Sequence, residues 1–145
     1  MKNDISAIGN ALVDTVFKVE HSLISELGLE IDQMTLSSAE EHAPIIERLI
    51  ASGAETVSDC GGSATNSLVA ASSFGAKCFH TCKVSDDQDG IRYLNSIKEA
   101  GIGHKGNMSS SKSIPSGKCL ILVTPDAKRT MTTALNVSSL MDEDD

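Results

Sequence analysis

The chain has 145 residues, a formal net charge of −8 and 40% hydrophobic residues, which suits one globular domain with its own core. The acidic balance excludes a nucleic-acid partner, because phosphate backbones require a basic face. The N-terminus is polar and no apolar run is long enough to cross a membrane, so we expect a cytoplasmic protein with neither a membrane partner nor a secretory signal.

The first third of the chain predicts short strands and two helices. Three segments rich in apolar or β-branched residues are predicted strands, the first of them buried: 5–8, 15–20 and 33–36. Residues 22–27 fit a short helix that ends at Gly28. Ser38 and Glu41 form a capping box, and Pro44 is expected to kink or delay the helix that follows. The apolar face predicted for that helix consists of Ile46, Leu49 and Ile50.

The middle of the chain alternates helices and strands. Residues 64–74 form a predicted helix that ends at Gly75, and 77–84 form a strand. Ser85 and Gln88 resemble a second capping box. The helix after it carries a predicted apolar face and a glycine stop: Ile91, Leu94, Ile97 and Gly101.

The strand pattern predicts a layered α/β domain with parallel strands and a second, smaller sheet. Residues 117–124 are a long apolar strand, and 129–134 pair with it as a hairpin. These two segments, with 15–20 and 33–36, do not fit the alternation of strands and helices. We therefore expect these four strands to form a separate sheet.

A glycine-rich run, Cys60 to Ala71, marks a loop that turns into a helix. Gly61 and Gly62 allow a ligand to approach the backbone closely, and the helix that follows presents unpaired N–H groups. Asn66, one turn into that helix, carries an amide that suits a polyhydroxylated ligand. A plain glycine-rich turn capped by Ser63 is the alternative interpretation.

Two further patterns could indicate a metal site, but the residues support neither well. Cys78, His80 and Cys82 alternate along a predicted strand, but one short strand is a poor frame for a metal, and small buried thiols are favoured. The run 87–90 is acidic, yet Ser85 and Ser96 stand where a calcium loop needs carboxylates. We therefore predict no metal site.

Four motifs in order resemble the PfkB (ribokinase-like) family of sugar and nucleoside kinases, most closely its adenosine kinase-like branch. They are Gly9-Asn10, Gly61-Gly62-Ser63 with Asn66, Ser116-Gly117, and Arg129-Thr130-Met131. The resemblance extends from Asp4 to about Ser139 and implies a layered α/β/α, Rossmann-like domain with a small β-sheet lid. It implies that 1–145 is the N-terminal part of one kinase domain, with lid strands near 15–20, 33–36, 117–124 and 129–134.

The resemblance also implies a role for individual residues. In the family, an aspartate at the position of Asp14 binds sugar hydroxyls, which a carboxylate at a strand end can do; a turn aspartate is the alternative. Arg129 matches a phosphate-contacting arginine, or it is an exposed hairpin cation. The substrate-binding residues that the resemblance implies, several of them equally explained by strand packing, are Asn10, Asp14, Gln33, Thr35, Gly61, Gly62, Ser63, Asn66, Cys119, Met131 and Thr133.

The function that the resemblance implies is phosphorylation of a nucleoside or sugar hydroxyl by ATP with Mg²⁺. The family's catalytic aspartate lies in a Gly-Ala-Gly-Asp motif, and neither that motif nor the Asn-x-x-Glu motif occurs here. We therefore expect the catalytic base downstream of Asp145, no catalytic residue in this chain, and an inactive fragment. A sugar kinase, a stand-alone ligand-binding module, or a homodimer through the lid strands remain open alternatives.

Overall fold

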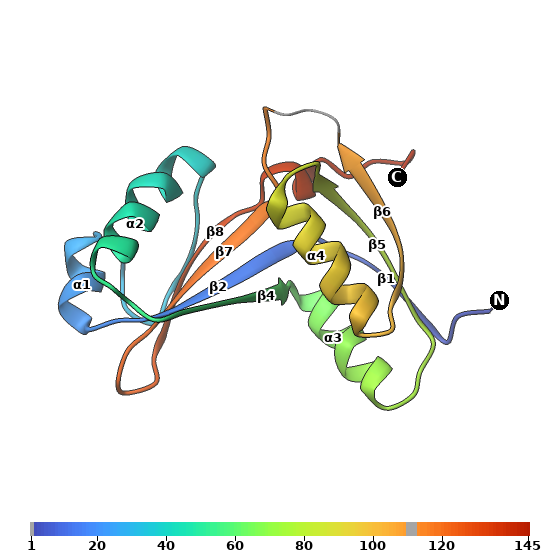
Figure 1. Cartoon of the computed structure of the whole chain (residues 1–145), viewed down its shortest axis with the longest axis horizontal. Coiled ribbons are helices and arrows are strands. Elements are labelled where there is room, and N and C mark those ends of the chain that lie inside the picture. The colour runs from blue at the N-terminus through green and yellow to red at the C-terminus, as the bar shows by residue number, and fades with distance from the viewer. Residues whose placement is uncertain (1, 110–112) are drawn as a thin grey trace.

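The computed structural model describes residues 2–109 and 113–145 and contains two sheets (Figure 1). The first sheet has the order β1-β5-β6, and all of its strands are parallel. Helices α3 and α4 pack against it. The bounds of these elements are β1 Ile5–Ile8, α3 Ser63–Ser73, β5 Cys78–Ser85, α4 Gln88–Glu99 and β6 Gly103–Ser109. This part confirms the predicted parallel α/β arrangement.

The second sheet is larger, with five strands in the order β3-β8-β7-β2-β4. It contains all four segments that were predicted to form a separate sheet because they do not fit the alternation of strands and helices. Strands β7 and β8 form the predicted hairpin. Figure 1 shows these strands extending away from α3 and α4 towards α1 and α2. The bounds are β2 Leu12–Lys18, β3 Met34–Leu36, β4 Thr56–Gly61, β7 Gly117–Val123 and β8 Arg129–Ala134.

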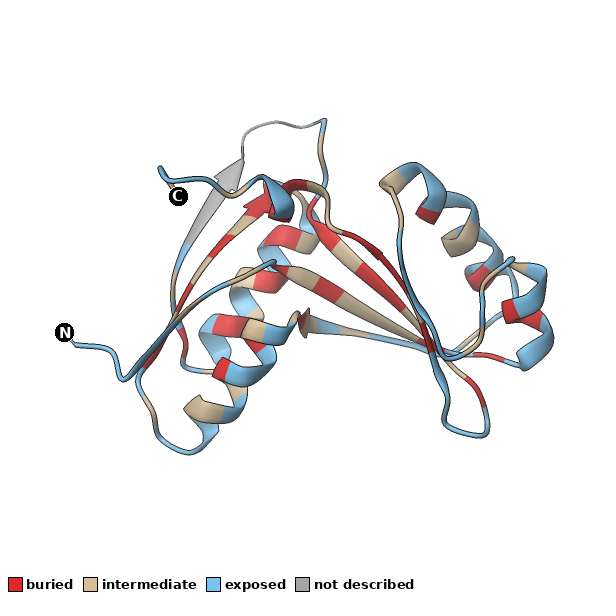
Figure 2. Cartoon of the chain, turned by 180° about the vertical axis from the view of Figure 1, so that it is seen from behind, coloured by how far each residue is buried: buried red, intermediate tan, exposed pale blue. Residues whose placement is uncertain are grey.

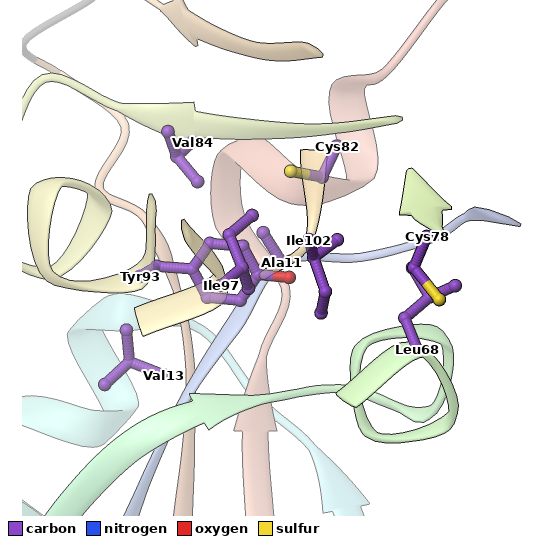
Figure 3. Packing of buried hydrophobic residues seen from close by; sticks show 9 residues of the cluster. All are labelled: Ala11, Val13, Leu68, Cys78, Cys82, Val84, Tyr93, Ile97 and Ile102. Carbon is purple, nitrogen blue, oxygen red and sulfur yellow. The ribbon is translucent and has the colours of Figure 1, made fainter. Parts of the chain in front are cut away.

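Each sheet has its own hydrophobic core. Under the three-stranded sheet, apolar side chains from β5, α3 and α4 meet, with Tyr93 and Ile97 fully buried (Figure 3). The five-stranded sheet buries Phe17, Leu120 and Leu122 against α1 (His21–Glu26) and α2 (Ala39–Ala51). On the opposite face of that sheet, Asp14 and Val16 of β2 and Ile121 of β7 are half-buried, whereas Cys119 is buried. Figure 2 shows buried and less buried residues alternating along these strands. A short 3-10 helix, Asn136–Leu140, follows β8.

The face of the five-stranded sheet that α2 leaves uncovered is formed by residues in register across the strands. Asp14 pairs with Cys119, and Cys119 pairs with Thr133, so these three side chains lie on one face. We call it the Asp14 face.

Strand prediction was wrong in four places. β2 begins at Leu12 instead of residue 15, because its first residues pair with Gly61 and Gly117. β4 and β6 were not predicted at all, because their sequences are mostly polar residues and glycine and each forms only an edge strand. β1 was predicted to be buried, yet Ile8 is 74% exposed because β1 lies at the edge of its sheet.

The helix ends and faces also differ from the predictions. The Ser38–Glu41 capping box is confirmed, and Pro44 does not delay the helix. Ser85 caps nothing, because β5 continues through it; Asp87 caps α4 by accepting a hydrogen bond from the Gly90 N–H at 2.7 Å.

The buried face of each long helix is rotated from the predicted one. In α4, Tyr93 is fully buried while Ile91 is 48% exposed. In α2, His42 is buried beside Leu49 while Ile50 is 68% exposed. The predicted faces were based on apolar residues alone. They missed both shifts because each buried face includes an aromatic side chain with a polar atom, Tyr93 in α4 and His42 in α2.

Candidate functional site

The candidate site forms where β2, β4 and α3 meet. Asp14 lies within β2 and not at a strand end, and Gly61 is the last residue of β4. A Cβ at residue 61 would overlap the carboxylate of Asp14. The absence of a side chain at Gly61 therefore makes the space that this carboxylate occupies.

Gly62 links this carboxylate to the helix. It has φ of 98° and stands at the N-cap position of α3, so Ser63 is the first helical residue and does not cap the helix. A Cβ at Gly62 would come within 2.6 Å of the Asn10 carbonyl oxygen. Asn66 N–H donates to the Gly62 carbonyl at 2.9 Å, and the Asn66 side chain is exposed. Asn10, Gly62 and the first turn of α3 thus lie beside Asp14.

The electrostatics of Asp14 follow from its surroundings. Burial, and then the negative charge of Asp59 on β4, raise the pKa of the Asp14 carboxyl. A partly desolvated carboxylate gains most from hydrogen bonds to its charged form, and two sugar hydroxyls can supply them. The arrangement is suited to binding a polyhydroxylated ligand.

A buried polar network lies beneath this site and was not predicted. The Thr65 hydroxyl on α3 lies 2.6 Å from the Tyr93 hydroxyl, which lies 3.1 Å from His80 Nε2. His80 Nδ1 donates to the Ala7 carbonyl at 3.3 Å, so Nε2 of the neutral ring accepts the Tyr93 proton. Burial lowers the pKa of His80, which agrees with a neutral ring. The network ties α3 to β1, β5 and α4.

The Tyr93→Phe variant is expected to lower the free energy of unfolding by about 1–3 kcal/mol, because Thr65 and His80 lose a buried partner. Urea denaturation measures this loss. The matched control is Ser67→Ala, which removes an exposed hydroxyl of α3 that bonds the Ser63 carbonyl. Equal stability of wild type and Tyr93→Phe would contradict the assigned network.

Two buried histidines predict how stability depends on pH. Burial is the main cause that lowers the pKa of both His42 and His80 in the folded chain. Unfolded histidine binds a proton near pH 6.5, so their contribution to stability is complete above that pH and is lost as the pH falls below it. We expect the free energy of unfolding to decrease from pH 7 to pH 5. A flat profile over this range, measured by urea denaturation, would show that neither ring is held neutral.

Three residues predicted to bind substrate lie on the Asp14 face of the sheet. Cys119 and Thr133 are directly in register with Asp14, and the Thr133 hydroxyl donates to Cys119 Sγ at 3.2 Å. Met131 lies on the same face, two residues along β8. It belongs to an apolar row, formed in register by Met34, Met131, Ile121, Val16 and Val57.

Other predicted residues lie apart from Asp14. Thr35 pairs with Thr132, and therefore lies on the sheet face that α2 covers. Gln33 precedes β3, and its carbonyl accepts from the Met131 N–H at 2.8 Å. Arg129 pairs with Val123, which is in register with Lys18. Arg129 is therefore displaced from Asp14 by four residues along the strand direction, roughly 13 Å, and by two strands across the sheet. The structure leaves the roles of these residues as predictions.

A cavity of about 500 Å³ lies elsewhere, at the far end of β2. Lys18, Arg48 and Thr124 are among its lining residues, and no predicted site residue lines it.

In the described part of the chain, no three His, Cys, Asp or Glu side chains are grouped to hold a metal ion. Cys78 and Cys82 are buried in the middle strand of their sheet, which confirms the interpretation as buried thiols.

Comparison with known protein families shows to which family this chain belongs. A sequence profile described as "pfkB family carbohydrate kinase" matches residues 30–145. The chain belongs to the pfkB family. No match to a curated protein sequence was found. Of the helices in residues 2–109 and 113–145, none is long and apolar enough to cross a membrane.

Solved structures of pfkB-type kinases share the fold, which confirms the predicted ribokinase-like class. Adenosine kinase from Sinorhizobium meliloti matches with a TM-score of 0.86 at 28% identity, over 100% of this chain and 43% of that one. A probable sugar kinase from Rhizobium etli matches with a TM-score of 0.88 at 24% identity, over 99% and 42% of the two chains. Anopheles gambiae adenosine kinase, solved with a di(adenosine) tetraphosphate, matches at 0.82 and 23% identity, over 96% and 41%. The chain therefore spans about two fifths of the length of these structures.

Proposed function

We propose that this chain is the substrate-binding part of an adenosine kinase-like enzyme, which transfers the γ-phosphate of ATP to a hydroxyl of a nucleoside. The observation that carries the proposal is the position of the Asp14 carboxylate over Gly61, beside the first turn of α3. Membership of the pfkB family and the resemblance to adenosine kinase structures support the reaction class.

The proposed site holds the ribose by its hydroxyl groups. Ionised Asp14 accepts hydrogen bonds from two neighbouring hydroxyls, and Asn66, exposed on the first turn of α3, supplies an amide that both donates and accepts. Gly61 and Gly62 let the ring approach the backbone. Asn10, whose carbonyl adjoins Gly62, completes this side of the proposed site. These residues bind and orient the acceptor; they do not transfer the phosphate.

The apolar row favours a nucleoside over a free sugar. Met131, Ile121 and Val16 lie on the same face as Asp14. Each is two residues along its strand from the residue that is in register with Asp14, or from Asp14 itself. Met34 is 56% exposed and Val57 72% exposed, so the row has accessible apolar surface. A flat base gains by covering such a surface, whereas a sugar has no apolar group to place there.

ATP is the proposed phosphate donor and Mg²⁺ its companion ion, as family membership implies. Phosphoryl transfer needs cationic stabilisation of the phosphates and a group that orients the attacking hydroxyl. The described residues offer no cluster of three metal-binding side chains, so we assign no metal ion to them. We assign no catalytic base to this chain because the Gly-Ala-Gly-Asp motif does not occur in it. The cation proposed to meet transferred phosphate is Arg129.

A sugar kinase is the second candidate, favoured by the structural match to a probable sugar kinase. A calorimetric competition between adenosine and ribose separates the two, since a nucleoside site binds adenosine far more tightly. Comparable affinity for ribose would overturn the nucleoside assignment.

A non-catalytic module that binds ligands or dimerises is the third candidate, favoured by the exposed residues of the apolar row. Sedimentation of the purified chain with and without adenosine tests it. A stable dimer that binds adenosine would favour this module. It would replace the kinase proposal if a longer protein that contains this chain also failed to phosphorylate adenosine.

A further inference from the structure

Asp59 stands directly opposite Asp14 across β2 and β4. The two residues are partners in the antiparallel register, so their side chains lie on the same face of the sheet. Directly opposed residues have Cβ atoms about 4.5–5.5 Å apart. Two carboxylates therefore lie side by side at the edge of the proposed ribose site.

Within residues 2–109 and 113–145, no cation neutralises either carboxylate. Asp59 is exposed, and one of its oxygens accepts a hydrogen bond from the Cys60 N–H at 2.7 Å. Among the ion pairs of the described residues, none involves Asp14 or Asp59. Like charges directly opposed on a sheet are destabilising, so this pair carries a cost in the unliganded chain.

We propose that Asp59 is a specificity-determining residue: with Asp14, it restricts the ligand end held at Asp14 to uncharged hydroxyl groups and rejects a phosphate there. This inference rests on the proposed function, because it assumes a hydroxylated ligand at Asp14. A phosphate at that end meets two uncompensated carboxylates, whereas hydroxyl groups donate hydrogen bonds to them. Discrimination by repulsion of this kind is a general route to specificity.

Of the groups that the structure describes, Asp59 is the charged one that acts on Asp14. The other titratable groups around Asp14 are Cys60, Cys119 and Tyr93. Burial raises the pKa of Cys60 to about 11 and raises the pKa of Cys119 and of Tyr93. These three groups are uncharged at neutral pH, so removal of the Asp59 charge changes the field at Asp14 most directly.

The test measures adenosine and adenosine 3′-monophosphate binding by calorimetry, in wild type and in Asp59→Asn. We expect wild type to bind adenosine about 100-fold or more tightly than adenosine 3′-monophosphate. In Asp59→Asn, this ratio of affinities should be about tenfold smaller. The control is Glu20→Gln, which removes one exposed charge beyond the far end of β2 and should leave the ratio unchanged. A ratio equal in wild type and Asp59→Asn overturns the inference.

A second readout needs no ligand. NMR titration of the Asp14 carboxyl should give a lower pKa in Asp59→Asn than in wild type, because the neighbouring charge is gone. An unchanged Asp14 pKa also overturns the inference. Failure of adenosine to bind wild type, by contrast, overturns the proposed function itself, and the inference falls with it.

Discussion

Replacement of Asp14 by asparagine is expected to weaken adenosine binding by at least about 100-fold, because hydrogen bonds to a charged group contribute about 1.5–3 kcal/mol each. Asparagine keeps the size of the side chain and its fit over Gly61, but it replaces one acceptor oxygen with an NH₂ donor. Isothermal titration calorimetry of wild type and variant measures the loss.

The control for this experiment is Asp86→Asn, which makes the same chemical change at an exposed residue between β5 and α4. We expect that variant to bind adenosine like wild type. Asp14 also has a raised pKa, so Asp14→Asn should be no less stable than wild type at pH 7. Adenosine affinity within a few fold of wild type in Asp14→Asn would remove Asp14 from the binding site.

Replacement of Gly61 by alanine is the second large effect. The new Cβ would overlap the Asp14 carboxylate, so either the side chain of Asp14 or the strand β4 must move. We expect a loss of about 1–3 kcal/mol in the free energy of unfolding, as for other overpacked sites. Adenosine binding should fall by about 100-fold, because the displaced carboxylate no longer meets the ribose.

A double-mutant cycle with Asp14→Ala isolates the cause. If the overlap with Asp14 is responsible, the Gly61→Ala change should cost much less stability in the Asp14→Ala background than in wild type. Urea denaturation of the four proteins gives this coupling without any ligand. An equal cost in both backgrounds would place the strain of Gly61→Ala elsewhere than at Asp14.

The sequence predicted much of the fold because its signals were local. Four β-rich segments that did not alternate with helices do form one separate sheet, and the Ser38–Glu41 pattern does cap α2. The edge strand β4 escaped prediction, since its polar residues pair only with β2. Tyr93 escaped because its hydroxyl is satisfied by Thr65 and His80, residues distant in sequence.

The site was predicted in part for the same reason. The glycine pair and Asn66 are contiguous in sequence, so their position at a helix start could be inferred from the chain itself. The opposition of Asp14 and Asp59 arises only from the register of β2 with β4, which no local pattern encodes. The separation of Thr35 from Asp14 likewise depends on which face of β3 packs towards α2.

The most direct test of the nucleoside site is an NMR titration of the isotopically labelled chain with adenosine. We expect amide shifts that saturate and that concentrate at Asn10, Asp14, Gly61, Gly62 and Asn66. Shifts confined to the cavity around Lys18, Arg48 and Thr124, or no saturable shifts at all, would contradict this expectation.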